Sequence, residues 1–198
     1  MKATITILSE RGKSMDNGAS SYRRFLDGDD KGIAEIVGEY KDGLILYLNG
    51  YVNNIFIAEE LTEDTFFRLI TKKPRFSGKS TFKTWLYTIG RNVAVDYIRH
   101  NSKMLATPIE DMENYLSEEQ SLEQSYIKEE RKLIVHKALS ELIPDYKIIL
   151  WLIYFEDFSN KEVAKVMRKS VHNTEVLVSR ARKALKEKLL KEGYIYEE

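Results

Sequence analysis

The spacing of apolar residues predicts a helix-rich chain. Between residues 81 and 100 no proline interrupts the sequence, and Ser80 just before this run is expected to cap a helix. The apolar residues of the run recur at the spacing of one helix face: Leu86, Ile89, Val93 and Tyr97. The pattern predicts one long helix with a face turned to a core.

Three further helical segments are expected before this run. Residues 22–39 are interrupted by the sequence LDGDD, and residues 40–48 are apolar enough for a helix that residues 50–54 weaken. Residues 57–70 follow, with apolar positions at Ile57, Leu61, Thr65 or Phe66, and Leu69. The opposite face of this segment is acidic, with like charges four residues apart that disfavour an isolated helix: Glu59, Glu60, Glu63 and Asp64. Such a face is either solvated or meets a basic partner.

The second half predicts a linker and a helix-turn-helix. Residues 106–125 contain Pro108, many acids and little periodicity. Helical spacing returns over residues 126–142, and residues 145–155 are apolar nearly all round, which indicates a buried helix. Ser159 and Glu162 form a capping-box pattern, and Ser170 is placed to cap the following helix. The expected inner faces are Val163, Ala164 and Met167 on one helix, and Thr174, Leu177, Val178, Ala181 and Leu185 on the next.

The predicted fold is all-α, with two small helical domains joined by an acidic linker, the second being a helix-turn-helix domain. The expected boundaries are a mobile tail over residues 1–20, a first domain over 21–103, the linker over 104–125 and a second domain over 126–194.

Composition narrows the classes of function. The sequence has no cysteine, which excludes disulfides and thiolate metal sites. It has no apolar run near the roughly 20 residues of a membrane span and no signal-peptide pattern, so we expect no membrane insertion and a cytoplasmic location. We find no Glu-x-x-His pair, no nucleophile–base pair and no phosphate-binding glycine loop. We therefore expect no metal, no cofactor and no catalytic residue.

Charge is balanced over the chain but segregated along it. The 198 residues include 31 Lys and Arg and 31 Asp and Glu, so the formal net charge is zero. Taken alone, a net charge of zero disfavours a nucleic-acid binder. In residues 71–103, however, every charged residue except Asp96 is basic. Residues 104–125 contain several acidic residues and no Lys or Arg, and basic residues predominate again after residue 159. This alternation predicts several surfaces with different partners.

A second stripe on the helix after residue 80 has the chemistry of a single-strand surface. Trp85, Asn92 and Arg99 are seven residues apart and so lie close together on one helix. Rings can stack on bases, cations meet phosphates and an amide can read a base edge. The candidates are Phe76, Lys79, Phe82, Lys83, Trp85, Arg91, Asn92 and Arg99. The alternative is an amphipathic core helix with a solvated basic face.

The last helix has the pattern of a recognition helix. In a helix-turn-helix the start of the second helix enters the major groove, which places His172, Asn173 and Val176 toward base edges. Lys169, Arg180 and Lys183 would then contact phosphates. Its outer face also includes Ser179 and Arg182. The alternative is an ordinary helical hairpin with a basic surface.

The sequence FKTWLYTIGRNVAVDYIRH, residues 82–100, resembles the promoter-melting segment of bacterial sigma factors of the extracytoplasmic-function (ECF) subfamily. The resemblance implies that the loop over residues 76–83 captures a base flipped from the minus-ten strand, and that Asn92 lines the same site. VSRARKAL, within the predicted helix-turn-helix, resembles the minus-thirty-five-binding domain. Two positions depart from that domain's pattern: Arg168 replaces the usual glycine of the turn, and Glu175 stands where a basic residue is common.

AEELTEDTF resembles the sigma-factor segment that docks on the clamp of the largest subunit of core RNA polymerase. By this resemblance Glu60, Leu61, Asp64 and Phe67 make that contact. Many relatives are held inactive by an anti-sigma factor, which is a further candidate partner.

The sequence thus predicts a sigma factor that binds core RNA polymerase and promoter DNA and helps to open the strands. Its main alternative is a stand-alone helix-turn-helix regulator that does not join polymerase. A structural helical protein without nucleic-acid affinity is a third class, disfavoured by the segregated basic blocks.

Overall fold

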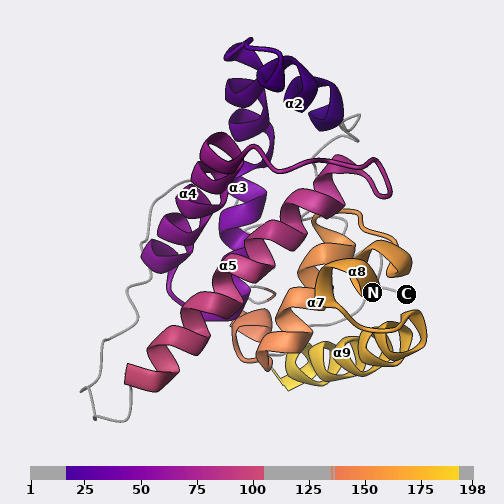
Figure 1. Cartoon of the computed structure of the whole chain (residues 1–198). Helices are drawn as coiled ribbons and strands as arrows, with labels where there is room; N and C mark the ends of the chain where they lie inside the picture. The colour runs from indigo at the N-terminus through magenta and orange to yellow at the C-terminus, as the bar shows by residue number, and fades with distance from the viewer. Residues whose placement is uncertain (1–16, 105–134, 136, 192–198) are drawn as a thin grey trace, which may run out of the picture.

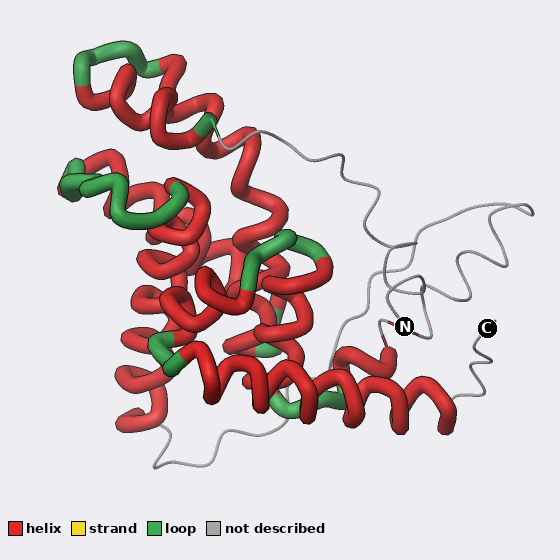
Figure 2. The backbone as a smooth tube through the Cα atoms, turned by 90° about the vertical axis from the view of Figure 1, so that its right-hand side faces the viewer, coloured by secondary structure: helices red, strands yellow, loops and turns green. Residues whose placement is uncertain are grey.

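Two groups of helices form the fold (Figure 1). The structure is a computed structural model that describes residues 17–104, 135 and 137–191. In Figure 2 this part of the chain contains helices and loops but no strand. The first group is α2 (Gly18–Leu26), α3 (Lys31–Val52), α4 (Ile55–Lys72) and α5 (Phe82–Met104), and the second is α7 (Pro144–Tyr154), α8 (Asn160–Met167) and α9 (Val171–Lys191). The predicted all-α fold is confirmed.

The helix breaks in the first group have local causes. The expected interruption at LDGDD separates α2 from α3, with Gly28 at a φ of 98° that favours glycine. The helix expected over residues 40–48 is part of the longer α3, which ends at Val52, within the residues expected to weaken it. It ends where Asn53 takes a left-handed conformation, and the Asn54 side chain then accepts hydrogen bonds from the first amides of α4.

The cap of helix α5 is Thr81, one residue later than the expected Ser80. The Thr84 backbone amide donates a hydrogen bond to the Thr81 Oγ1 atom at 3.2 Å, so Thr81 holds the cap position. Of the predicted core stripe, Leu86 and Val93 are buried and Ile89 and Tyr97 are half-buried.

The second group is a helix-turn-helix that follows the buried helix α7. Pro144 opens α7, and Ser159 with Glu162 forms the predicted capping box at α8. Arg168 ends α8 with a φ of 54°, the left-handed region that explains why a glycine is usual there. The Asn173 amide donates to Ser170 Oγ at 3.1 Å, which confirms Ser170 as the cap of α9.

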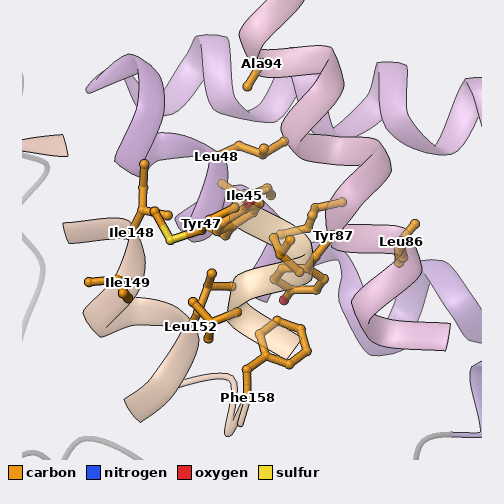
Figure 3. Close-up of a cluster of buried hydrophobic side chains, with 14 of the residues drawn as sticks. Ile45, Tyr47, Leu48, Leu86, Tyr87, Ala94, Ile148, Ile149, Leu152 and Phe158 are labelled. Atoms are coloured by element: carbon orange, nitrogen blue, oxygen red, sulfur yellow. The ribbon is translucent and has the colours of Figure 1, made fainter. Parts of the chain in front are cut away.

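The two groups pack directly on each other. Helix α7 lies against α3 as well as α9, and α8 lies against α5 (Figure 1). Figure 3 shows the apolar contact between the groups. Tyr87 of α5 packs against Phe158, which follows α7, and Ile148 of α7 faces α3. A Cβ atom on Gly50 would lie 2.9 Å from Ile148 Cγ1, so the glycine in α3 allows the close approach. One core therefore extends across both helix groups.

Several expectations fall outside the described residues: the tail up to residue 16, nearly all of the acidic linker and most of the helix expected over residues 126–142. Within the described ranges, no helix has the length and apolarity needed to cross a membrane.

Candidate nucleic-acid and polymerase interfaces

An aromatic cluster anchors the loop before α5. The Trp85 ring lies 5.2 Å from Phe76, 5.4 Å from Phe82 and 5.3 Å from Tyr22, measured between ring centroids. The Tyr22 hydroxyl donates a hydrogen bond to the Pro74 carbonyl oxygen at 2.8 Å. Tyr22 thus ties the start of the loop to α2. Sequence reasoning missed Tyr22, which lies more than 50 residues from the loop.

Phe82 is buried, which corrects its assignment as a DNA contact. Its side chain is only 1% exposed and packs against Tyr22, Tyr40, Phe76 and Trp85. The ring therefore supports the cluster from within. Phe76 and Trp85 are half-buried, and they leave ring surface at the solvent boundary where a base could stack.

The predicted stripe along α5 is present on the surface. Trp85 and Asn92 are half-buried, and Arg99 is exposed. The Asp96 carboxylate lies 3.9 Å from the guanidinium groups of both Arg68 and Arg99. Exposed pairs at this distance contribute little free energy.

Besides Arg99, two further proposed cations have protein partners. The half-buried Arg91 lies near the Tyr47–Tyr51 pair, whose hydroxyls are 3.1 Å apart. Burial raises the pKa of the Tyr51 phenol, while Tyr47 and the Arg91 guanidinium oppose that rise. Lys83 is the second: its ammonium lies 2.8 Å from the Glu156 carboxylate, in the interface with the second helix group. Lys79, by contrast, is exposed.

The outer face of α4 combines acidic and apolar side chains. Glu60 and Asp64 are exposed, and the Phe67 side chain is 63% exposed. Leu61 is only 4% exposed and belongs to the core, so its assignment as a polymerase contact is wrong. Phe56 and Ile70, at 67% and 41% exposed, lie on the outer face and were missed.

These residues form a stripe that the sequence could have revealed. Positions 56, 60, 63, 67 and 70 follow the three- and four-residue spacing of one helix face. We call Phe56, Glu60, Glu63, Phe67 and Ile70, with the adjacent Asp64, the α4 outer stripe.

Helix α9 exposes the residues that the sequence predicts to contact DNA. His172, Asn173, Val176, Arg180 and Lys183 are all exposed. Lys169 is also exposed, but its ammonium lies 3.1 Å from the Asp145 carboxylate of α7. Arg182 differs from its expected place on the outer face: it is half-buried, with its guanidinium 5.5 Å from the centroid of the Tyr154 ring.

Two family matches cover most of both helix groups. Residues 36–104 match the family described as Sigma-70 region 2, and residues 132–185 match the family described as Sigma-70, region 4. The chain belongs to the ECF sigma factors. Region 2 of this sigma factor contains α4, α5 and most of α3, and region 4 contains α7, α8 and most of α9. Helix α2, which carries Tyr22, precedes the region 2 match.

The relatives of this sigma factor are similar along most of their length. RNA polymerase sigma factor YlaC of Bacillus subtilis is 25% identical over 160 residues, which cover 80% of this chain and 92% of the relative. The ECF RNA polymerase sigma-E factor of Haemophilus influenzae is 28% identical, over 84% of this chain and 92% of its own.

Solved structures show the same fold. The sigma factor RpoE of Bartonella quintana, in complex with the anti-sigma factor NepR, superposes with a TM-score of 0.62 at 26% identity, covering 81% of this chain and 98% of RpoE. CnrH, solved with the cytosolic domain of CnrY, has a TM-score of 0.59 at 16% identity and covers 87% of this chain and 96% of its own.

Proposed function

We propose that this sigma factor binds core RNA polymerase through the α4 outer stripe and reads a promoter with both of its regions. The observation that carries the proposal is that one chain contains both a region 2 and a region 4. The α4 outer stripe is exposed on region 2, and the predicted DNA-contacting residues of α9 are exposed on region 4. The chain would act by binding alone, as a non-catalytic initiation factor in the cytoplasm where transcription takes place.

For the minus-ten element, we propose that the loop over residues 76–81 and the α5 stripe hold the melted strand. Phe76 and Trp85 would stack on bases, Asn92 would contact a base edge, and Lys79 and Arg99 would meet phosphates. Unstacking a base costs a few kcal/mol, which stacking and pocket contacts would offset.

For the minus-thirty-five element, we propose that α9 enters the major groove. His172, Asn173 and Val176 lie in its first two turns, and Arg180 and Lys183 lie further along. The first three would face bases and the two cations would face phosphates. Lys169 would join them after leaving Asp145, an exposed partner of the kind that contributes little free energy.

The partner proposal also includes an anti-sigma factor. The RpoE and CnrH structures were solved with such a protein or a cytosolic domain bound. We propose that a protein of this class inhibits the present sigma factor.

The first experiment is gel filtration of the purified chain with sigma-free core RNA polymerase. Co-elution is expected, and the double reversal Glu60→Lys with Asp64→Lys should abolish it, because both carboxylates are exposed on one face of α4. The matched control is Asp27→Lys with Glu187→Lys, the same charge change at exposed positions just after α2 and on α9. No co-elution, with duplex binding by the free chain, would instead support the stand-alone regulator.

A second experiment addresses strand opening on a promoter selected with the holoenzyme. Asn92→Ala should reduce permanganate reactivity of unpaired thymines while co-elution with polymerase is retained. Asn101→Ala, further along the same helix, serves as the control. Unchanged opening in Asn92→Ala would refute the base contact.

A further inference from the structure

Helix α2 holds the start of the loop that leads into α5. Gly18, Tyr22 and Phe25 are buried and recur at helical spacing, so they lie on one face of α2. The Tyr22 hydroxyl donates a hydrogen bond to the Pro74 carbonyl oxygen at 2.8 Å, and the Lys73 ammonium lies 4.8 Å from the centroid of the Phe25 ring. Two successive residues of the loop are therefore bound to α2 directly after α4 ends.

The Tyr22 hydrogen bond fixes the backbone at Pro74. The proline ring already restricts φ to about −65°, and the residue has no N–H, so its carbonyl is the backbone group left to form a hydrogen bond. Holding this carbonyl also fixes the peptide plane that leads to Arg75, one residue before Phe76. Burial raises the pKa of the Tyr22 phenol to about 12, so the hydroxyl stays protonated and able to donate at neutral pH.

The Tyr22 ring also contacts the surface proposed to stack on bases. This ring is only 1% exposed and its centroid lies 5.3 Å from that of Trp85. The Trp85 ring in turn lies 5.2 Å from Phe76. One residue therefore acts on both of these half-buried rings, on Trp85 through direct packing and on Phe76 through the loop backbone.

Helix α2 is itself fixed on α3 by contacts that do not involve the loop. A Cβ atom at Gly32 of α3 would lie 2.2 Å from the Ser21 carbonyl oxygen, so a glycine there allows the two backbones to touch. The Ser21 hydroxyl donates a hydrogen bond to the Glu35 carboxylate at 2.7 Å, and the Arg24 guanidinium pairs with the same carboxylate. The support behind Tyr22 is thus in place before the loop is considered.

We propose that Tyr22 is a positioning residue for capture of the flipped minus-ten base, with its hydroxyl holding the loop and its ring holding Trp85. This inference rests on the proposed function for the identity of the base-binding surface. It extends the determinants of that surface to α2, which precedes the region 2 match. A preformed site spends less free energy on ordering than a mobile loop does, so the hydrogen bond contributes to DNA affinity without touching DNA.

The test compares two tyrosines of the same aromatic cluster. Tyr22→Phe removes the hydroxyl that holds Pro74 and keeps the ring against Trp85. Tyr40→Phe is the matched control, because Tyr40 is also buried, packs on Phe82 with ring centroids 5.9 Å apart, and has its hydroxyl beside Gly18 of α2. Each variant removes one buried hydroxyl, so a general loss of stability, measured by urea unfolding, would affect both.

The functional readout is binding of a single strand by the holoenzyme. The probe is a fluorescein-labelled oligonucleotide that carries the minus-ten sequence of a promoter selected with the holoenzyme, and fluorescence anisotropy gives the Kd. Tyr22→Phe should weaken binding about two- to tenfold, the change that corresponds to one net hydrogen bond, and Tyr40→Phe should leave it unchanged. In a Phe76→Ala background, Tyr22→Phe should add little, because the ring that the loop positions is gone. Equal effects of the two tyrosine variants, or full additivity with Phe76→Ala, would overturn the positioning role.

A second readout needs neither polymerase nor DNA. The chain has two tryptophans, so Trp151→Phe leaves Trp85 as the single fluorescent reporter. Acrylamide should quench Trp85 more strongly in Tyr22→Phe than in the parent or in Tyr40→Phe, because a released loop uncovers the ring that Phe76 packs against. Unchanged quenching would overturn the hold on the loop. Unchanged single-strand affinity in Phe76→Ala would instead refute the proposed stacking surface, whatever the quenching shows.

Discussion

Leu61 and Phe67 lie six residues apart on α4 and should respond to truncation in opposite ways. Leu61 is 4% exposed, so Leu61→Ala removes a side chain that the core surrounds almost completely. Buried Leu→Ala changes cost about 2–5 kcal/mol, from lost transfer free energy and the remaining cavity. Phe67 is 63% exposed, and Phe67→Ala should change the free energy of unfolding by only about 0.5 kcal/mol.

The same two variants should reverse their order in polymerase binding. Phe67 is the large exposed ring in the middle of the α4 outer stripe, between Glu63 and Ile70. An anchor of this kind costs about 1–2 kcal/mol when truncated, which weakens the Kd about five- to thirtyfold. Leu61→Ala should leave the Kd of the folded fraction unchanged, because its side chain faces away from the partner.

Urea unfolding followed by circular dichroism measures the first quantity, and fluorescence anisotropy with labelled sigma factor and core polymerase measures the second. Phe56→Ala is a useful companion, since this residue is 67% exposed on the same stripe. If Leu61→Ala kept its stability and lost polymerase affinity, the orientation of α4 described above would be wrong. If Phe67→Ala bound normally, the stripe would lose its role as the polymerase contact.

Three further outcomes follow from single groups. Arg168→Gly should stabilise the protein by up to about 1 kcal/mol in urea unfolding, because Arg168 has a φ of 54°; a loss of stability would refute this reasoning. Arg180→Gln should weaken duplex binding on all sequences and lower the slope of log affinity against log salt by about one unit, whereas a sequence-selective loss would indicate a base contact. Burial raises the pKa of Glu162, but hydrogen bonds from Ser159, Thr81 and Thr84 outweigh this and lower it below 4.5. The ionised form is therefore favoured in the folded state, so its contribution is present above pH 4.5 and is lost as the pH falls through the lowered pKa. Acid unfolding should show this loss in the parent but not in Glu162→Gln, and equal pH profiles would contradict it.

The helices could be predicted from local sequence because their signals are local. The break at LDGDD, the cap at Ser170 and the capping box of Ser159 and Glu162 each depend on a few neighbouring residues, and each is present. The boundary errors are local too. Helix α5 starts after Thr81 and not Ser80, since either hydroxyl residue could serve as the cap.

The candidate site was less predictable, because ring chemistry and burial give opposite indications. Phe82 was assigned to DNA as one of several rings near the loop, yet positions 82, 86, 89 and 93 form one helix face and place Phe82 with the core. Leu61 was similarly assigned to polymerase by resemblance, although its spacing with Ile57 and Leu69 already put it on the apolar face. In both cases the periodicity was the better guide.

The contact between the two regions had no local signal at all. Glu156 follows the apolar run of α7 and reads as an ordinary surface acid, and its partner Lys83 lies 73 positions earlier. Gly43 and Gly50 reduce the helix propensity of α3, and from sequence alone that effect favoured a weakened helix. Their use as points of close approach became visible only with Glu156 and Ile148 placed against them.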